Sequence, residues 1–270
     1  MMKSEIKFKV WRMVLGIVAL YTFSSLPANA QWFNDSEDDS PFSAYVEADL
    51  VSRYMWRGLD KGGISIQPAV GISLWDFSFL ATGNVGFDKE DEEELNLTLG
   101  FEKFGFNMGV IDYWQTGIDP DNRYFHFKNK ETAHTLEGNI GYTHEYFSLQ
   151  AYTRFWGHDY KINGERAYST YVELSIPFHI GDIDIEGKVG VTPMESAGDM
   201  LYTGKKDDLG DPVKEPVYLY AGGFACNLVS ARVTKTFHYK NMQFPIYAEL
   251  HTNPYLQKAN FLVGVSVVAF

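Results

Sequence analysis

Polar and apolar residues alternate with a period of two along most of the chain beyond residue 42. In the first such segment Val46 and Leu50 fall on one side, whereas Glu47 and Asp49 fall on the other. Successive side chains of a β-strand point to opposite faces, so this pattern predicts a strand with one apolar and one polar face. The same division recurs at 93–102, 168–177 and 183–192. Beyond residue 42 the sequence shows neither helical periodicity nor an apolar run long enough for a membrane helix. The pattern therefore predicts an all-β fold.

The predicted strands are joined by connectors that alternate between long and short. Twelve strands are expected near 43–57, 64–75, 78–87, 93–102, 105–114, 134–143, 147–157, 168–177, 183–192, 226–237, 244–252 and 261–270. Longer connectors follow the odd-numbered strands, at 58–63, 88–92, 115–133, 158–167, 193–225 and 253–260. Only a few residues follow the even-numbered strands, around Asp76, Lys103, Glu145, His179 and Lys240. A soluble sandwich shares the alternation, but short turns at one rim and longer loops at the other are typical of a transmembrane antiparallel β-barrel. An even number of strands places both ends of the barrel on the periplasmic side.

Aromatic residues concentrate at the ends of the predicted strands, as in the two interfacial girdles of an outer-membrane barrel. The girdle at the short-turn rim is expected to contain Trp75, Phe77, Phe101, Phe104, Tyr146, Phe147, Phe178, Phe237, Tyr239 and Phe244. The girdle at the long-loop rim is expected to contain Tyr54, Trp56, Phe87, Trp114, Phe155, Trp156, Tyr168 and Phe261.

Two strands carry unusual features. The last strand ends on Phe270, and both of its faces are apolar, so the pattern does not say which face meets lipid. A C-terminal aromatic strand is the segment by which the barrel-assembly machinery recognises such proteins, which makes that machinery an expected partner. Pro68 lies inside the strand predicted at 64–75, where it predicts a bulge or an early end.

The first 30 residues have the features of a signal peptide. Lys3, Lys7, Lys9 and Arg12 precede an apolar run from Met13 to Phe23, and Ala28-Asn29-Ala30 provides a cleavage site. The apolar run is too short for a spanning helix, and no cysteine follows it to accept a lipid. The expected organisation is a signal peptide at 1–30, an acidic periplasmic segment at 31–42 and an outer-membrane barrel at 43–270.

Composition and charge exclude several classes of protein. The chain is 45% hydrophobic and 16% aromatic, which is too apolar for a disordered protein. Its net charge is −12, and it becomes −15 without residues 1–30, which hold four basic residues and Glu5. This acidity argues against nucleic acid as a partner. A single cysteine, Cys226, excludes an internal disulfide and a multi-cysteine zinc site.

The segment Ser52-Arg53-Tyr54-Met55-Trp56-Arg57-Gly58, followed by Gln67-Pro68-Ala69-Val70, resembles the opening of the TorF-type porin family. Members of that family typically begin with Ser, Asp, Tyr, an aromatic residue, an aromatic or small residue, Arg and Gly, and a Pro-Ala-Val segment follows. Arg53 stands where the family usually has an acid. The resemblance covers roughly the first thirty strand residues, and it implies an exported barrel and a porin without naming a solute.

Charged residues on the polar faces are the candidate site. They are expected to point into the lumen and comprise Glu47, Asp49, Arg53, Arg57, Glu137, Arg154, Glu173, Asp184, Glu186, Lys188 and Glu249. One interpretation is a structural network, since buried charges must be paired. The other is a selectivity lining that sets the electric field for passing solutes. On strand 43–57, Arg57 is expected at the outer mouth, and Arg53 deeper and close to Glu47 and Asp49.

Cation binding and hydrolysis are alternative roles for some of the polar residues. The acidic run 88–94 and the group Asp119, Asp121 and Asn122 could bind divalent cations, but they match no complete calcium loop and are better explained as solvated, mobile surface. A hydrolase could use His158, Asp159, Ser148, Ser175, or His251 with Glu249, but none of the serines lies in a nucleophile motif. His144, His179 and His238 fall in short turns, where turn polarity explains them better than a metal site does.

The sequence therefore predicts a barrel in the outer membrane, in contact with its lipid, that passes small polar solutes passively. It predicts no enzyme activity, catalytic residue, metal or cofactor. The alternatives are a structural or surface-interaction barrel with a plugged lumen and, less favoured, an outer-membrane hydrolase.

Overall fold

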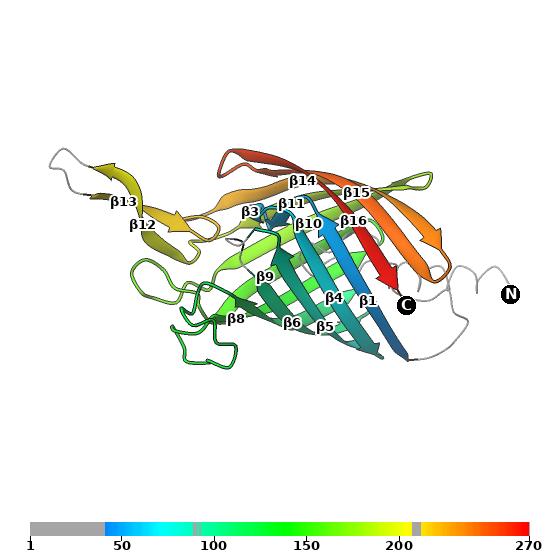
Figure 1. The fold of residues 1–270 in the computed structure, drawn as a ribbon, viewed down its shortest axis with the longest axis horizontal. Coiled ribbons are helices and arrows are strands. Elements are labelled where there is room, and N and C mark those ends of the chain that lie inside the picture. The colour runs from blue at the N-terminus through cyan, green and yellow to red at the C-terminus, as the bar shows by residue number, and fades with distance from the viewer. Residues whose placement is uncertain (1–40, 89–90, 92, 207–211, 270) are drawn as a thin grey trace.

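The computed structural model describes residues 41–88, 91, 93–206 and 212–269. The predicted signal peptide, residues 31–40 of the acidic segment and Phe270 lie outside the described residues. Twelve antiparallel strands close into a barrel, which confirms the predicted fold class. Figure 1 shows the arrangement of this barrel. In order around the barrel these are β1 (Phe42–Val51), β4 (Ser65–Leu74), β5 (Phe77–Gly86), β6 (Glu94–Lys103), β7 (Phe106–Gln115), β8 (His134–His144), β9 (Phe147–Gly157), β10 (Thr170–Ile180), β11 (Ile183–Thr192), β14 (Ala225–Tyr239), β15 (Met242–Asn253) and β16 (Lys258–Ala269). In the described part of the chain, no helix is long and apolar enough to cross a membrane.

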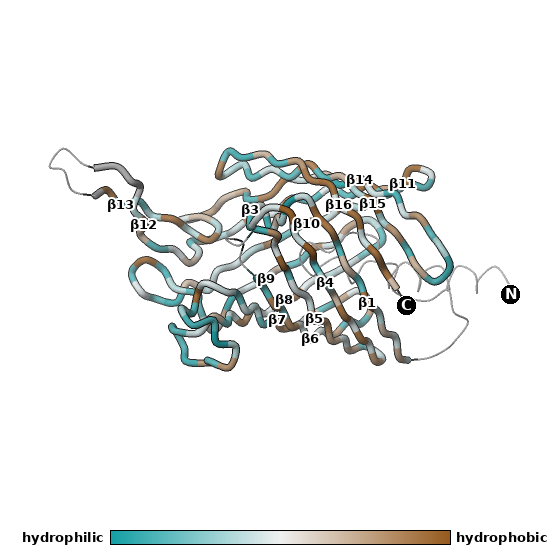
Figure 2. The backbone as a smooth tube through the Cα atoms, in the orientation of Figure 1, coloured by the Kyte–Doolittle hydropathy of each residue, from teal (hydrophilic) through white to brown (hydrophobic). Residues whose placement is uncertain are grey.

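The alternation of the sequence becomes an apolar exterior and a polar interior. On β1, Val46 is 57% exposed and Leu50 45%, whereas Glu47 is 1% exposed and Asp49 is fully buried. This distribution is the reverse of that in a soluble protein, and it suits a wall that meets lipid on its outside. Figure 2 shows apolar positions recurring along the strands of this wall. The last strand also has defined faces, with Leu262, Ser266 and Val268 turned inward and Phe261 and Val263 outward.

The two rims of the barrel differ in the length of their connections, as the sequence pattern predicted. Two-residue turns join β4 to β5, β6 to β7, β8 to β9, β10 to β11 and β14 to β15. Trp75, Phe104 and Lys240 have positive φ angles in these turns, which is the backbone geometry of tight hairpins. Trp75 and Phe104 are strongly exposed and belong to the predicted short-turn girdle.

The first predicted strand, 43–57, is too long. β1 ends at Val51, and the chain then forms a separate hairpin of β2 (Tyr54–Trp56) and β3 (Leu59–Gly62). Tyr54 and Trp56 are buried among side chains of the lumen, so their prediction as girdle residues is wrong. The reversal at Arg57 and Gly58, which both have positive φ, turns the segment back on itself. We name this unit, residues 53–63, the inner hairpin.

A second hairpin forms within the long connector predicted at 193–225. Its strands are β12 (Gly198–Lys206) and β13 (Pro212–Tyr218), and Figure 1 shows it projecting beyond the barrel wall. We name it the outer hairpin. The bulge predicted at Pro68 is absent from the described pairing, because the register of β4 with β5 is the same at Ile66 and at Ala69. Pro68 is still accommodated inside β4, opposite Ala48 of β1.

Inward glycines make room for inward tyrosines on neighbouring strands. Tyr247 lies over Gly264, where an added Cβ would stand 2.3 Å from the Tyr247 Cζ. Tyr45 covers Gly71 in the same way, and Tyr171 covers Gly190. Aromatic side chains laid over strand glycines fix register and fill the interior. The lumen of this barrel is consequently narrower than its strand number alone suggests.

Candidate functional site

An ion pair between the inner hairpin and the barrel wall crosses the lumen. Arg57, at the reversal of the hairpin, donates from Nη1 to Glu137 Oε2 at 2.8 Å and from Nη2 to Oε1 at 2.6 Å. The two side chains are 3% and 0% exposed. The Tyr113 hydroxyl donates to Glu137 Oε1 at 3.1 Å, and Arg57 also donates to the Tyr220 hydroxyl at 2.8 Å. Bidentate geometry with further hydrogen bonds offsets the cost of burying both charges.

Aromatic rings enclose the Arg57 guanidinium. Its Cζ lies 4.0 Å from the ring centroid of Tyr152, 4.7 Å from that of Trp56 and 5.0 Å from that of Tyr171. Cation–π contacts of this kind strengthen when the cation is removed from water. Trp56 also stacks on Tyr220 at 5.8 Å. The buried cluster comprises Tyr54, Trp56, Ile111, Tyr113, Tyr152, Tyr171 and Tyr220, and we name it the aromatic plug.

A second anchor holds the backbone of the inner hairpin. The Gly58 N–H donates to His251 Nε2 at 3.0 Å, and the Asn253 amide donates to the Gly58 carbonyl at 3.2 Å. His251 Nδ1 faces Glu249 Oε1 at 3.0 Å, which assigns the ring proton to Nδ1. Gly58 has a φ of 84°, and an added Cβ would lie 1.8 Å from the Asn227 carbonyl oxygen. Only glycine fits at this point of closest approach.

A third anchor lies on the opposite wall. The Tyr54 hydroxyl donates to Glu94 Oε2 at 2.8 Å, and Lys61 Nζ lies 3.7 Å from Glu94 Oε1. Gln115 donates to the same carboxylate. The inner hairpin is therefore attached to β6, β8 and β15, which lie on different sides of the lumen.

A cavity remains between the inner hairpin and the barrel wall, where its lining residues come from β1, β4, β9 to β11 and β14 to β16. It measures about 600 Å³, including space open to solvent, and its floor and sides contain Gln67, Tyr247 and charged residues. Lys188 lies 3.3 Å from Glu186 and 3.8 Å from Glu173, and Arg232 pairs with Glu249 at 2.7 Å. The cavity thus presents alternating positive and negative groups beside the aromatic plug.

The structure places most of the predicted site residues inside the barrel. Those with buried or partly buried inward side chains are Glu47, Asp49, Arg57, Glu137, Arg154, Glu173, Glu186, Lys188 and Glu249. Arg154 joins the central pair, with its Nε 4.0 Å from Glu137 Oε2. Asp184 lies apart from these residues, near the short-turn rim, where it pairs with His179.

The predicted depths of Arg53 and Arg57 are reversed. The Arg53 side chain is 42% exposed and pairs with Asp60 of β3, whereas Arg57 is the buried arginine. The physical reason is that β1 ends at Val51. Beyond that residue the alternation of polar and apolar residues no longer predicts how deep a side chain lies in the barrel. Arg53 is consequently not a partner of Glu47 or Asp49 in the described hydrogen bonds and ion pairs.

Two important residues were missed. Arg232 occupies an inward position in the alternation of the strand predicted at 226–237, so the sequence pattern could have identified it as a lumen residue. Tyr220 belongs to the connector after the outer hairpin, and its return into the lumen depends on tertiary contacts alone.

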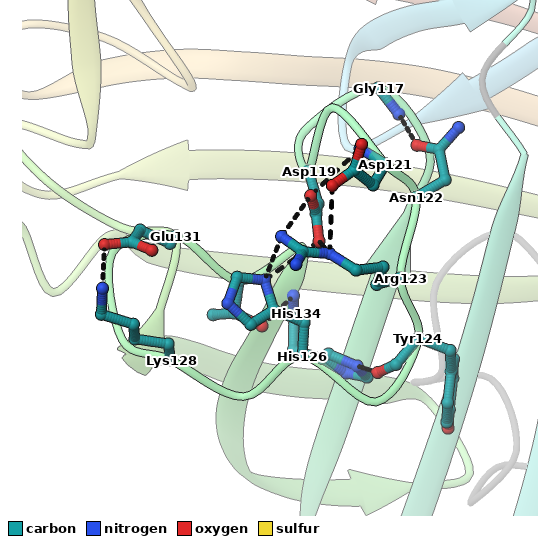
Figure 3. A network of polar contacts seen from close by, with 11 residues as sticks. Gly117, Asp119, Asp121, Asn122, Arg123, Tyr124, His126, Lys128, Glu131 and His134 are labelled. Carbon is teal, nitrogen blue, oxygen red and sulfur yellow. Dashed lines mark hydrogen bonds and ion pairs between the residues drawn. The ribbon is translucent and has the colours of Figure 1, made fainter.

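Most side chains of the connector at 116–133 are exposed, as predicted for Asp121 and Asn122, but Asp119 is buried in a network of polar contacts (Figure 3). Asp119 is fully buried and accepts hydrogen bonds from Arg123 Nε at 3.1 Å and from the Asp121 N–H at 3.1 Å. These bonds hold the pKa of Asp119 well below its ordinary value, with Arg123 as the main cause. His126 Nδ1 lies 3.0 Å from the same carboxylate, and Asn122 accepts from the Gly117 N–H. The carboxylate that could have bound a cation is thus occupied by a guanidinium, and the described residues contain no cluster of three or more metal-ligating side chains.

The residues considered for hydrolysis do not converge on one nucleophile. The Ser148 hydroxyl bonds with Thr143, and Ser175 lies opposite Lys188 in the β10–β11 register. Asp159 accepts from the Ser169 N–H. His251 Nε2, the atom that a general base would use, accepts from Gly58.

Comparisons with known proteins add little beyond the fold. No family model matches the chain, and no curated protein matches it. Among solved structures it is similar to the outer membrane phospholipase A of Escherichia coli, with 12% identity over 84% of this chain and 92% of that one and a TM-score of 0.36. It is also similar to Salmonella typhi OmpF in complex with daunomycin, with 10% identity over 84% and 97% and a TM-score of 0.33. For CdiB from Acinetobacter baumannii the identity is 8% over 85% and 60%, with a TM-score of 0.33. These low scores carry no argument, and the outer-membrane type of barrel stands on its strand pairing and exposed apolar wall.

Proposed function

We propose that this protein is an outer-membrane channel for small polar solutes, and that the inner hairpin closes its lumen at rest. The observation that carries the proposal is the buried Arg57–Glu137 pair, because it joins the segment that follows β1 to β8, which lies across the ring of strands from β1. The channel performs no chemistry on the solute. Membership of the TorF-type porin family and placement in the outer membrane are part of the same proposal.

The connectivity of the inner hairpin supports a movable closure. β2 and β3 pair with each other and form a sheet separate from the barrel. Movement of the hairpin would therefore leave the ladder of the wall intact. The hydrogen bonds that attach it to the wall involve the side chains of Glu137, His251, Asn253 and Glu94, and they can break and re-form without unfolding a strand.

The lining of the cavity supports a polar solute. Paired groups such as Lys188 with Glu173 and Arg232 with Glu249 offer both signs of charge along one wall. Groups of this kind replace part of the hydration shell of a solute in a narrow passage. The buried aromatic plug occupies part of the lumen, which argues against a wide diffusion pore.

Planar-bilayer recording of the refolded protein tests the proposal. The wild type is expected to stay mostly closed with rare discrete openings, and a variant in which a short glycine-serine linker replaces residues 53–63 should open frequently. Lys103→Ala is the matched control, since it removes an exposed ion pair with Asp76 at the short-turn rim and should record like the wild type.

A plugged barrel with a surface role is the second candidate. The aromatic plug inside the lumen and the projecting outer hairpin favour it. A folded linker variant that remains as silent as the wild type would support this candidate and overturn the channel.

A further inference from the structure

His251 holds the tip of the inner hairpin through a bond that fixes the charge of its ring. The Gly58 N–H donates to His251 Nε2 at 3.0 Å, and both residues are buried. A backbone N–H is a donor and never an acceptor, so Nε2 must present a lone pair and no proton. The other ring nitrogen, Nδ1, lies 3.0 Å from Glu249 Oε1 and holds the single ring proton. The closed arrangement, in which the hairpin contacts the wall, therefore requires a neutral imidazole.

A second proton on the ring is incompatible with this contact. It would occupy Nε2 and direct one N–H group of the ring at the N–H group of Gly58. The buried amide would then lose its acceptor, and a buried donor without an acceptor costs free energy. The closed arrangement is therefore less stable when His251 is charged.

The wall supplies charges of both signs around His251. Those that line the same cavity are Glu173 of β10, Lys188 of β11, Arg232 of β14 and Glu249 of β15. On β16 the strand register places the uncharged Asn260 opposite His251. All of these residues belong to the barrel strands, so they stay beside His251 whether or not the hairpin is in contact with the wall.

The inner hairpin itself brings positive charge to the same cavity. Arg53 and Arg57 both line it together with His251. Withdrawal of the hairpin would carry these two cations away from the ring, and like charges near a histidine oppose its protonation. Release of the hairpin therefore both frees Nε2 and removes charges that oppose a proton there.

We propose that protonation of His251 weakens the attachment of the inner hairpin, so that mild acid opens the lumen. The released arrangement binds one proton more than the closed one, so the equilibrium shifts toward release as the pH falls. Histidine is the side chain that ordinarily changes charge between about pH 5 and about pH 8. His251 lines a cavity that includes space open to solvent, which gives protons access to it. Opening by acid rests on the proposed channel function, whereas release of the hairpin is measurable without conduction.

Trp56 reports on the position of the inner hairpin, because it is buried in the aromatic plug. The refolded barrel is labelled with 5-fluorotryptophan, and its fluorine NMR spectrum is recorded at about pH 7.5 and about pH 5. Trp56→Phe identifies the signal of this residue. Its buried signal should lose intensity in acid to a second signal, and the ratio of released to closed hairpin should rise about tenfold.

His251→Gln should abolish this response, because the glutamine oxygen accepts a hydrogen bond from Gly58 and the side chain does not titrate. His179→Gln is the matched control, since His179 is exposed at the short-turn rim and pairs with Asp184. It should respond to acid as the wild type does. A wild-type Trp56 signal that is the same at both pH values would overturn the proposal, and so would an equal response in His251→Gln.

Bilayer recordings at the same two pH values separate this proposal from the channel. Discrete openings that become about ten times more frequent in acid, in the wild type and not in His251→Gln, would support both. A Trp56 signal that responds to acid through His251 in a barrel that never conducts would support the histidine switch and overturn the channel.

Discussion

The described part of the chain contains two hairpins outside the barrel ladder, and their side chains lie in opposite environments. The inner hairpin places Trp56 and Arg57 among buried residues, whereas the outer hairpin exposes Leu201, Tyr202 and Val217 by 50%, 67% and 49%. Each forms its own two-stranded sheet. A short isolated hairpin is marginally stable, so what distinguishes the two is the side-chain anchoring of the first to the wall.

The largest expected effect in this comparison is that of Arg57→Ala. It leaves Glu137 buried without its cation, which should lower the free energy of unfolding by about 3–5 kcal/mol. Lys214→Ala removes a cation 4.5 Å from the Tyr202 ring in the outer hairpin and should change stability by less than about 0.5 kcal/mol. Each variant is heated to a series of temperatures and run on a gel without boiling. The temperature at which the band of the folded barrel disappears measures the difference in stability. Equal effects would mean that the Arg57 pair does not anchor the hairpin.

Gly58→Ala should have the next largest effect. The added methyl meets the Asn227 carbonyl and enforces a left-handed backbone on alanine, at a cost of about 1–3 kcal/mol. Gly223→Ala serves as the control, because an added Cβ there has no neighbour within 4 Å. Chemical unfolding of both variants gives the comparison, and an undisturbed Gly58→Ala barrel would show that the hairpin sits less tightly against β14.

Acid should loosen the loop at 116–133 as the pH falls below about 4. A carboxylate with a lowered pKa contributes stability above its unfolded value of about 3.9 and loses that contribution as pH falls through its folded value. The pKa of Asp119 is held low by Arg123, so the loop should resist pepsin near pH 4 and become cleavable, at the exposed Phe125, toward pH 2. Asp119→Asn should already be cleaved near pH 4. Identical cleavage of both proteins at every pH would contradict the role of Asp119.

Deletion of the outer hairpin should have the smallest effect. Replacing residues 199–217 by a short glycine-serine link retains Tyr220 and should change the unfolding free energy by less than about 0.5 kcal/mol. The gel assay described for Arg57→Ala also measures the stability of this deletion variant. Substantial destabilisation would show that the outer hairpin contributes to the barrel.

The fold was largely predictable because lipid and lumen impose opposite demands on successive residues. That constraint acts throughout the wall, and it located the strands and the inward faces of Glu47, Glu137 and Glu249. The constraint gave a wrong prediction after Val51. Tyr54 and Trp56 continue the alternation of the preceding strand, but they belong to the inner hairpin and not to the barrel wall. The turn pair Arg57-Gly58 was the local sign of this reversal.

The site was predictable only in part. Arg57 was placed inside the barrel, but its contact with Glu137 joins residues 80 positions apart through a hairpin that periodicity does not reveal. Tyr220 returns to the lumen from a long connector, and no local pattern predicts this return. Long-range packing decides both positions.

The central claim is that the Arg57–Glu137 pair closes the lumen, and single-channel recording of a charge exchange tests it most directly. Arg57→Glu and Glu137→Arg should each open the channel frequently, because like charges then face each other across the lumen. The double variant should return to the closed behaviour of the wild type, since the attraction is restored with its sign reversed. Folded single variants that stay as closed as the wild type would contradict the claim.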